Sequence, residues 1–161
     1  MIRRAVLAGM LVALLPFTPA RAGPVRFPQD DAADFTLETA VADAHETHRY
    51  AVIVFGADWC HDSRFLADVL TSEEFTREFG ERFAVTFIDV GRPQVAGQGR
   101  NLSVVASLGV NNLRSTPALL VVAGDGRRLN SKRDAVSWRN AESRGKDAIL
   151  GWFRDFLKRS A

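Results

Sequence analysis

The chain has 161 residues, of which 47% are hydrophobic and 25% are charged. This composition is typical of a globular protein and excludes a disordered chain, a collagen-like repeat and a polytopic membrane protein. The formal net charge is +2, and the single cysteine, Cys60, excludes an internal disulfide and a cysteine-rich zinc site.

Residues 1–22 have the pattern of a secretory signal peptide. Arg3 and Arg4 form a basic start, Ala5 to Phe17 is an apolar run, and Ala20-Arg21-Ala22 fits a cleavage site. The run is shorter than the roughly 20 residues of a membrane-spanning helix, although an uncleaved anchor is the alternative. We therefore expect an exported protein, periplasmic or secreted, with no stable membrane anchor after cleavage. Without this arginine-rich segment the chain is slightly acidic, so we expect no nucleic-acid partner.

The segment 23–34 is rich in proline and aspartate and is expected to form an extended N-terminal lead-in to one domain, residues 35–161. In the first half of that domain, helical apolar spacing alternates with a continuous β-prone run. The expected order is helix 35–48, strand 50–55, helix 60–70 and a short helix that the capping box Thr71-Ser72-Glu73-Glu74 opens.

The second half of the domain continues the alternation. Its expected elements are strand 83–90, loop 91–99, helix 102–108, strand 118–123, a short strand 127–129 after the turn Gly124-Asp125-Gly126, and helix 146–158. Residues 133–144 are polar and give no clear prediction. This order favours an α/β layered domain with parallel pairing early and an antiparallel hairpin late.

Cys60 stands where a buried strand ends and a helix begins. The first turn of a helix has unpaired N–H groups and the positive end of the helix dipole. A thiol at this position is stabilised as the thiolate, which is the form that attacks disulfides. Trp59 is expected to shield one side of the sulfur. The alternative is a buried, unreactive thiol.

The stretch Trp59-Cys60-His61-Asp62-Ser63, between a strand and a helix, resembles the active-site segment of the thioredoxin superfamily. Ser115-Thr116-Pro117 before the next strand resembles the family's cis-proline segment, which packs against the cysteine. The resemblance implies a thioredoxin-like three-layer α/β/α sandwich with a central mixed sheet of four to five strands. It also implies a substrate-binding role for Thr116 and Pro117.

Two departures from the family pattern bear on function. Ser63 replaces the second cysteine, so the motif is Cys-x-x-Ser, and nothing in the chain can resolve a mixed disulfide. Ser63 can instead donate a hydrogen bond to the Cys60 thiolate. The buried acid that such enzymes often carry in the preceding strand is replaced by Val54. That acid assists proton transfer to the resolving cysteine, so the loss of both is coherent.

The charges around Cys60 act in opposite directions. A protonated His61 and the helix start favour the thiolate, whereas Asp58 and Asp62 oppose it. His61 is a candidate catalytic residue, with a solvated surface residue as the alternative. His45 and His48 lack an evident third ligand, so we expect no metal, and we expect no cofactor.

Two functions remain open on the sequence. The first is monothiol thiol–disulfide exchange, in which Cys60, Ser63, Trp59 and His61 act on a disulfide- or thiol-containing protein or a small thiol. A further protein partner could resolve the mixed disulfide. The alternative is a redox-silent binding module that holds a peptide or protein partner in the groove between Trp59 and Pro117. Peroxide reduction through a Cys60 sulfenic acid is a third possibility, for which the sequence has no distinctive feature.

Overall fold

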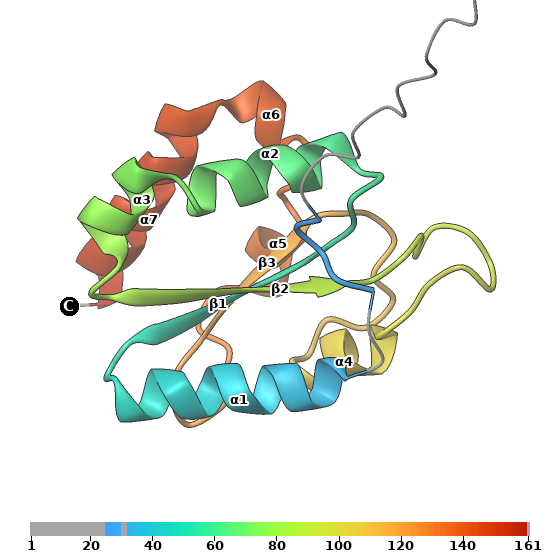
Figure 1. The fold of residues 1–161 in the computed structure, drawn as a ribbon, viewed down its shortest axis with the longest axis horizontal. Coiled ribbons are helices and arrows are strands. Elements are labelled where there is room, and N and C mark those ends of the chain that lie inside the picture. The colour runs from blue at the N-terminus through green and yellow to red at the C-terminus, as the bar shows by residue number, and fades with distance from the viewer. Residues whose placement is uncertain (1–24, 30–31, 161) are drawn as a thin grey trace, which may run out of the picture.

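A computed structural model describes residues 25–29 and 32–160 (Figure 1). The predicted signal peptide, 1–22, lies outside the described residues. The helices and strands follow in chain order: α1 (Ala33–Glu46), β1 (Tyr50–Gly56), α2 (His61–Leu70), α3 (Glu73–Phe79), β2 (Phe83–Asp89), α4 (Leu102–Ser107), β3 (Ala118–Val122), α5 (Lys132–Ala135), α6 (Ala141–Arg144) and α7 (Lys146–Ser160).

The described part of the chain forms a three-stranded mixed sheet with β1 at its centre. The strand order is β2-β1-β3, with β1 parallel to β2 and antiparallel to β3. In this register Val54 pairs with Phe87 on one side and with Leu119 on the other. A central strand has both faces covered, which explains why the sequence from Tyr50 to Phe55 is apolar throughout rather than alternating.

The sheet has fewer regular strands among the described residues than the expected four to five. The segment predicted as strand 127–129 folds back along β3 after the expected turn. It forms an isolated β-bridge between Val122 and Arg128 and not a regular strand. The side chain of Asn130 replaces the next backbone partner: its Oδ1 accepts from Val121 N at 3.0 Å, and its Nδ2 donates to Leu119 O at 2.9 Å. The ladder therefore ends in a side-chain amide.

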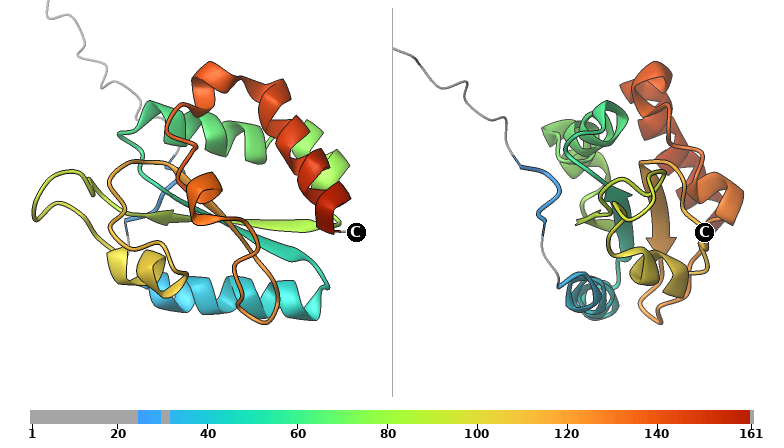
Figure 2. Two further views of the ribbon diagram at one scale, coloured as in Figure 1. Left: turned by 180° about the vertical axis from the view of Figure 1, so that it is seen from behind. Right: turned by 90° about the vertical axis from the view of Figure 1, so that its right-hand side faces the viewer.

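Helices cover both faces of the sheet, which gives the predicted three layers (Figures 1 and 2). On one face, Val52 and Val54 pack with α2, α3 and α7. On the other face, Ala51, Ile53 and Phe55 pack with α1 and α4. The alternation of side chains along β1 thus divides the core into two hydrophobic clusters. The thioredoxin-like α/β sandwich is confirmed.

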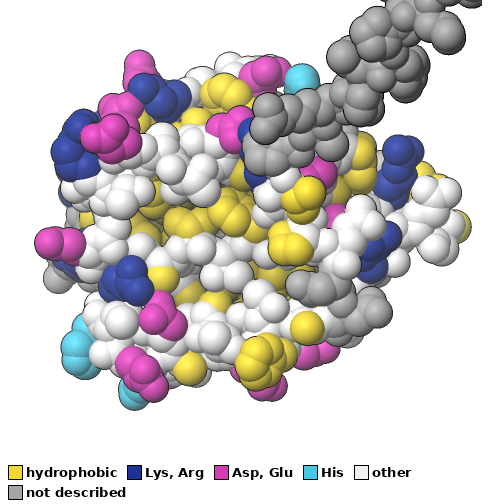
Figure 3. Space-filling model, viewed as in Figure 1, with side chains coloured by type: hydrophobic (Ala, Val, Ile, Leu, Met, Phe, Trp, Pro, Cys, Tyr) yellow, Lys and Arg dark blue, Asp and Glu magenta, His cyan; other side chains and the backbone are white. Residues whose placement is uncertain are grey.

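Strand β2 forms one edge of the sheet. Apolar side chains are visible on this side of the molecule, in the strip between the two helical layers (Figure 3). Phe27, from the segment expected to be a lead-in, closes one end of this edge. Its ring is fully buried and packs edge-on against Phe87, with centroids 5.4 Å apart. Residues before α1 therefore contribute to the core.

The start of α3 follows a local capping signal, whereas the polar stretch 133–144 has no clear predicted structure. The predicted short helix after Thr71 is present as α3, and its N-cap is Ser72, whose side chain accepts a hydrogen bond from Phe75 N. The polar stretch 133–144 contains α5 and α6, and it also carries the fully buried Trp138. None of the helices described in residues 25–29 and 32–160 combines the length and hydrophobicity that crossing a bilayer requires.

Candidate functional site

Cys60 is the N-cap residue of α2. Its backbone is extended (φ −87°, ψ 116°), its N–H donates to Ala57 O at 3.0 Å, and its carbonyl accepts from Arg64 N at 3.0 Å. The chain leaves buried strand β1, makes one tight turn and enters the helix, as the Gly56-Ala57-Asp58 break predicts. The thiol therefore sits beside the free N–H groups of the first helical turn. The residue is 9% exposed.

The peptide bond between Thr116 and Pro117 is cis, and it faces Cys60. The Cys60 Sγ atom lies 3.5 Å from the carbonyl oxygen of Thr116 and donates a hydrogen bond to it. Sheet pairing produces this contact between residues 56 positions apart. Because β1 and β3 are antiparallel, with Phe55 opposite Ala118, the residues that follow β1 meet those that precede β3.

Trp59 presents its ring to the surface next to the thiol. The residue is 42% exposed, and its Nε1 donates to Gly91 O at 2.9 Å. The Arg92 guanidinium lies over the ring, 5.0 Å from its centroid, in cation–π geometry. The loop after β2 therefore holds the Trp59 ring in place, on the residue that directly precedes Cys60.

Ser63 is fully buried one turn into α2. Its Oγ has no hydrogen-bond partner among the described residues. The expected hydrogen bond from Ser63 to the sulfur is therefore not formed, and the thiol instead donates to Thr116. The Oγ of Ser63 faces β1, where a Cβ added to Gly56 would lie 2.8 Å away. The helical twist turns residue 63 towards the sheet.

His61 and Asp62 join the first turn of α2 to α6. His61 Nε2 lies 2.8 Å from Glu142 Oε2, and both side chains are about half exposed. Asp62 Oδ1 accepts from the backbone N–H of Glu142 at 3.0 Å. His61 therefore points to the surface and to α6, and the structure gives it no contact with the thiol.

The site belongs to a recognisable family. A thioredoxin-like family model matches residues 31–124, which include Cys60, Pro117 and all three strands. The chain belongs to the thioredoxin-like family. Among solved structures it is similar to a disulphide isomerase from Xylella fastidiosa Temecula1, with 27% identity, a TM-score of 0.73, and coverage of 84% of this chain and 99% of that chain. No match was found among curated proteins.

Three features of this thioredoxin-like site were not predicted from the sequence. The Asp58 carboxylate accepts hydrogen bonds from the backbone N–H groups of Arg26 and Phe27, which fixes the segment before α1 beside the turn that precedes Cys60. The buried Asp89 holds the loop that carries Gly91, through an ion pair with Arg100 at 3.1 Å and a bond from Gly91 N at 3.2 Å. For Asp89, the sequence does contain a signal, because it is a single acidic residue at the end of an apolar strand.

Glu142 is the third such feature. It lies in the polar stretch 133–144, which has no clear predicted structure, and no periodic pattern there places it beside His61. Only the packing of α6 against α2 creates the contact.

Two further residues that bear on the site, Val54 and Thr116, are buried. Val54, which occupies the position of the family's buried acid, is fully buried in β1. Thr116 is 6% exposed, and its Oγ1 has no hydrogen-bond partner among the residues the structure describes. In that same part of the chain, no three metal-ligating side chains come together.

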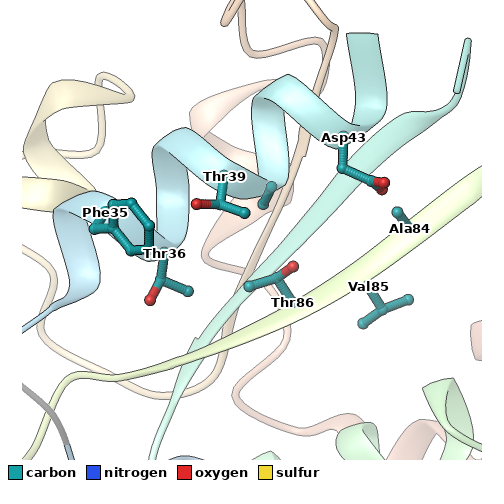
Figure 4. Close-up of a pocket in the computed structure, with 8 residues that line it drawn as sticks. Phe35, Thr36, Thr39, Asp43, Ala84, Val85 and Thr86 are labelled. Carbon is teal, nitrogen blue, oxygen red and sulfur yellow. The ribbon is translucent and has the colours of Figure 1, made fainter. Parts of the chain in front are cut away.

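A separate hollow of about 420 Å³ lies between α1 and β2 (Figure 4). Phe35, Thr39 and Thr86 line it, and none of the site residues does. Its single titratable lining residue, Asp43, is paired with Arg49 at 2.9 Å. We assign no chemistry to this hollow.

Proposed function

We propose that this thioredoxin-like protein carries out monothiol thiol–disulfide exchange through Cys60. The observation that carries the proposal is the position of the Cys60 thiol. It lies at the start of α2, directly opposite the carbonyl before the cis-proline. Thiolate is the attacking form, and free N–H groups at a helix start favour it.

The exchange has two balanced steps. The Cys60 thiolate attacks one sulfur of a substrate disulfide, forms a mixed disulfide and releases the other sulfur as a thiolate. A second thiolate then attacks the substrate sulfur of that mixed disulfide and restores the Cys60 thiolate. If the second thiolate belongs to the substrate, the net result is isomerisation. If it belongs to a small thiol or another protein, the net result is reduction of the substrate and oxidation of that donor.

The resolving thiol must come from outside the chain. Cys60 is the only cysteine, and Ser63 occupies the position of the family's second thiol. A disulfide- or thiol-containing protein, or a small thiol, is therefore the partner class. The 27% identity with a disulphide isomerase supports disulfide-bonded proteins as substrates. Substrate segments would lie along Trp59, Thr116 and Pro117.

The compartment follows from the N-terminal segment. Residues 1–22 carry the signal-peptide pattern, so the substrates are expected in the cell envelope or outside the cell. Disulfides persist in such oxidising compartments, which gives an exported exchange protein its substrates.

The test is to compare the protein with Cys60→Ser and with the control Ser107→Cys/Cys60→Ser, which restores one thiol elsewhere on the surface. Mixed disulfides are trapped in cells by acid quenching and alkylation, and refolding of a protein with scrambled disulfides is measured in a glutathione buffer. We expect Cys60-dependent conjugates and activity that neither variant shows. Activity retained in Cys60→Ser would contradict the proposal.

A redox-silent binding module is the second candidate. The low exposure of the thiol, 9%, together with the exposed ring of Trp59, favours a surface that holds an extended segment without turnover. On this alternative, Cys60→Ser binds the partner as tightly as the wild type, whereas Trp59→Ala loses binding.

A further inference from the structure

We propose that the α5–α6 segment carries a binding site for a phosphate group, separate from the Cys60 site. A hollow of about 410 Å³ lies on this segment. Seen from behind, α5 lies in front of the sheet and α6 lies above it (Figure 2). The hollow is lined by three arginines and by Val136, Ser137 and Asn140.

The three arginines, Arg133, Arg139 and Arg144, face a hollow that no acidic residue lines. Arg133 and Arg139 are exposed and form no hydrogen bond or ion pair with any part of the chain that the structure describes. Three cations around one concavity repel one another, and a bound anion relieves that repulsion. This arrangement selects for negative charge.

Arg144 is held in position before any ligand arrives. Its Nε donates to Asn140 Oδ1 at 3.0 Å, its Nη2 donates to the carbonyl of Ser137, and its guanidinium lies 4.8 Å from the centroid of the Trp138 ring. Trp138 is fully buried, so the stacking platform is fixed. A pre-positioned guanidinium loses less freedom when it binds an oxyanion.

The two acids closest in sequence are engaged elsewhere. Asp134 accepts from Trp152 Nε1 at 3.2 Å, and Glu142 pairs with His61 at 2.8 Å. Neither carboxylate lines the hollow, so the arginines are not neutralised locally.

The chemistry of the lining favours phosphate over a carboxylate. Guanidinium groups bind phosphate oxygens through paired N–H donors, and three of them match a group that carries up to two negative charges. The amide of Asn140 adds a further donor. The phosphate could be free in solution, or it could belong to the headgroup of an anionic lipid.

Phosphate binding is tested with the purified protein and two double variants. Arg133→Gln/Arg139→Gln removes two cations from the hollow. Arg82→Gln/Arg114→Gln removes two exposed arginines that lie outside it and serves as the charge-matched control. Binding of inorganic phosphate is measured by calorimetry at about 0.15 M ionic strength, where diffuse attraction is screened. Vesicles of phosphatidylcholine, with and without phosphatidylglycerol, are tested by co-sedimentation.

We expect the first double variant to bind phosphate roughly tenfold more weakly than the wild type, since it loses charge-assisted hydrogen bonds. The control variant is expected to bind as the wild type does. Sedimentation with phosphatidylglycerol vesicles that depends on Arg133 and Arg139 would identify a lipid headgroup as the source. Phosphate binding without sedimentation would identify soluble phosphate. Equal effects of the two double variants, or no binding of either probe, would overturn the site.

Discussion

The Nε2 atom of His61 lies 2.8 Å from Oε2 of Glu142, so the residue that follows Cys60 is tied to α6. The backbone N–H of the same Glu142 donates to Asp62. Two consecutive residues of the first turn of α2 are thus held by one residue of a short helix. The segment α5–α6, inserted between β3 and α7, supports the Cys60 site from outside.

Glu142→Gln is expected to remove the charge of this contact while α6 keeps its position beside α2. The backbone bond to Asp62 remains, and the exposed ion pair is worth at most about 1 kcal/mol, so the free energy of unfolding changes little. Loss of the carboxylate makes the surroundings of the first turn of α2 more positive, which favours the Cys60 thiolate. We expect faster alkylation of Cys60 than in the wild type. An unchanged alkylation rate would show that this contact does not affect the thiol.

Phe27 is expected to be a stabilising core residue even though it precedes the first helix. Its ring is fully buried against Phe87, so Phe27→Ala should lower the free energy of unfolding by about 3–5 kcal/mol. Phe35→Ala is the matched control, because Phe35 is 70% exposed and its loss should change stability by less than about 0.5 kcal/mol. Urea denaturation measures both. Equal losses would mean that the segment 25–29 does not pack as described.

Gly56 is required because the chain passes close to two side chains at the end of β1. An added Cβ would lie 2.6 Å from the Phe27 ring and 2.8 Å from Ser63 Oγ. Gly56→Ala should therefore destabilise the fold by about 1–3 kcal/mol. Gly151→Ala, in α7 with no atom within 4 Å of the added Cβ, should stabilise it by about 0.5–1 kcal/mol. Thermal unfolding of the two variants should shift in opposite directions.

Ser63→Ala is expected to leave the alkylation rate of Cys60 unchanged, because the Ser63 hydroxyl donates no hydrogen bond to the sulfur. Stability should be unchanged or higher, since a buried hydroxyl without a partner is costly, by about 1–3 kcal/mol. Ser137→Ala is the control, because that hydroxyl donates to Asp134 O at 2.8 Å and its loss should destabilise. Slower alkylation in Ser63→Ala would show that the hydroxyl does reach the thiolate.

Acid is expected to weaken the contact between α3 and α7. A hydrogen bond from Arg154 holds the pKa of Glu78 below its ordinary value of 4.5, and Lys146 lowers the pKa of Glu74 in the same way. The stability from these pairs is present above pH 4.5 and is lost as the pH falls through the lowered values.

The variant Glu74→Gln/Glu78→Gln tests this pH dependence. Its Tm should vary less with pH than that of the wild type below the ordinary glutamate pKa. High salt should reduce the difference between the two proteins, because both carboxylates are near the surface. Parallel Tm profiles of the variant and the wild type would contradict the assignment.

The sequence determined the features that local physics controls. Tyr50 to Phe55 is apolar throughout, which requires a buried central strand, and the break at Gly56-Ala57-Asp58 places Cys60 at a helix start. The family resemblance of the Trp-Cys and Thr-Pro segments predicted that the thiol faces Pro117. The first two predictions depend on the residue pattern within one element and at its end. The third depends on the order of the Trp-Cys and Thr-Pro segments along the chain.

Tertiary structure decided which groups pair across the chain. The partner of the thiol is Thr116 O rather than Ser63, because the helical twist turns residue 63 towards β1. Asn130 ends the sheet ladder where a fourth strand was expected, since a side-chain amide can satisfy the same backbone groups. Glu142 reaches His61, and the three arginines line one hollow, only because the segment 133–144 folds with Trp138 buried in the core. Such contacts leave no periodic pattern in the sequence.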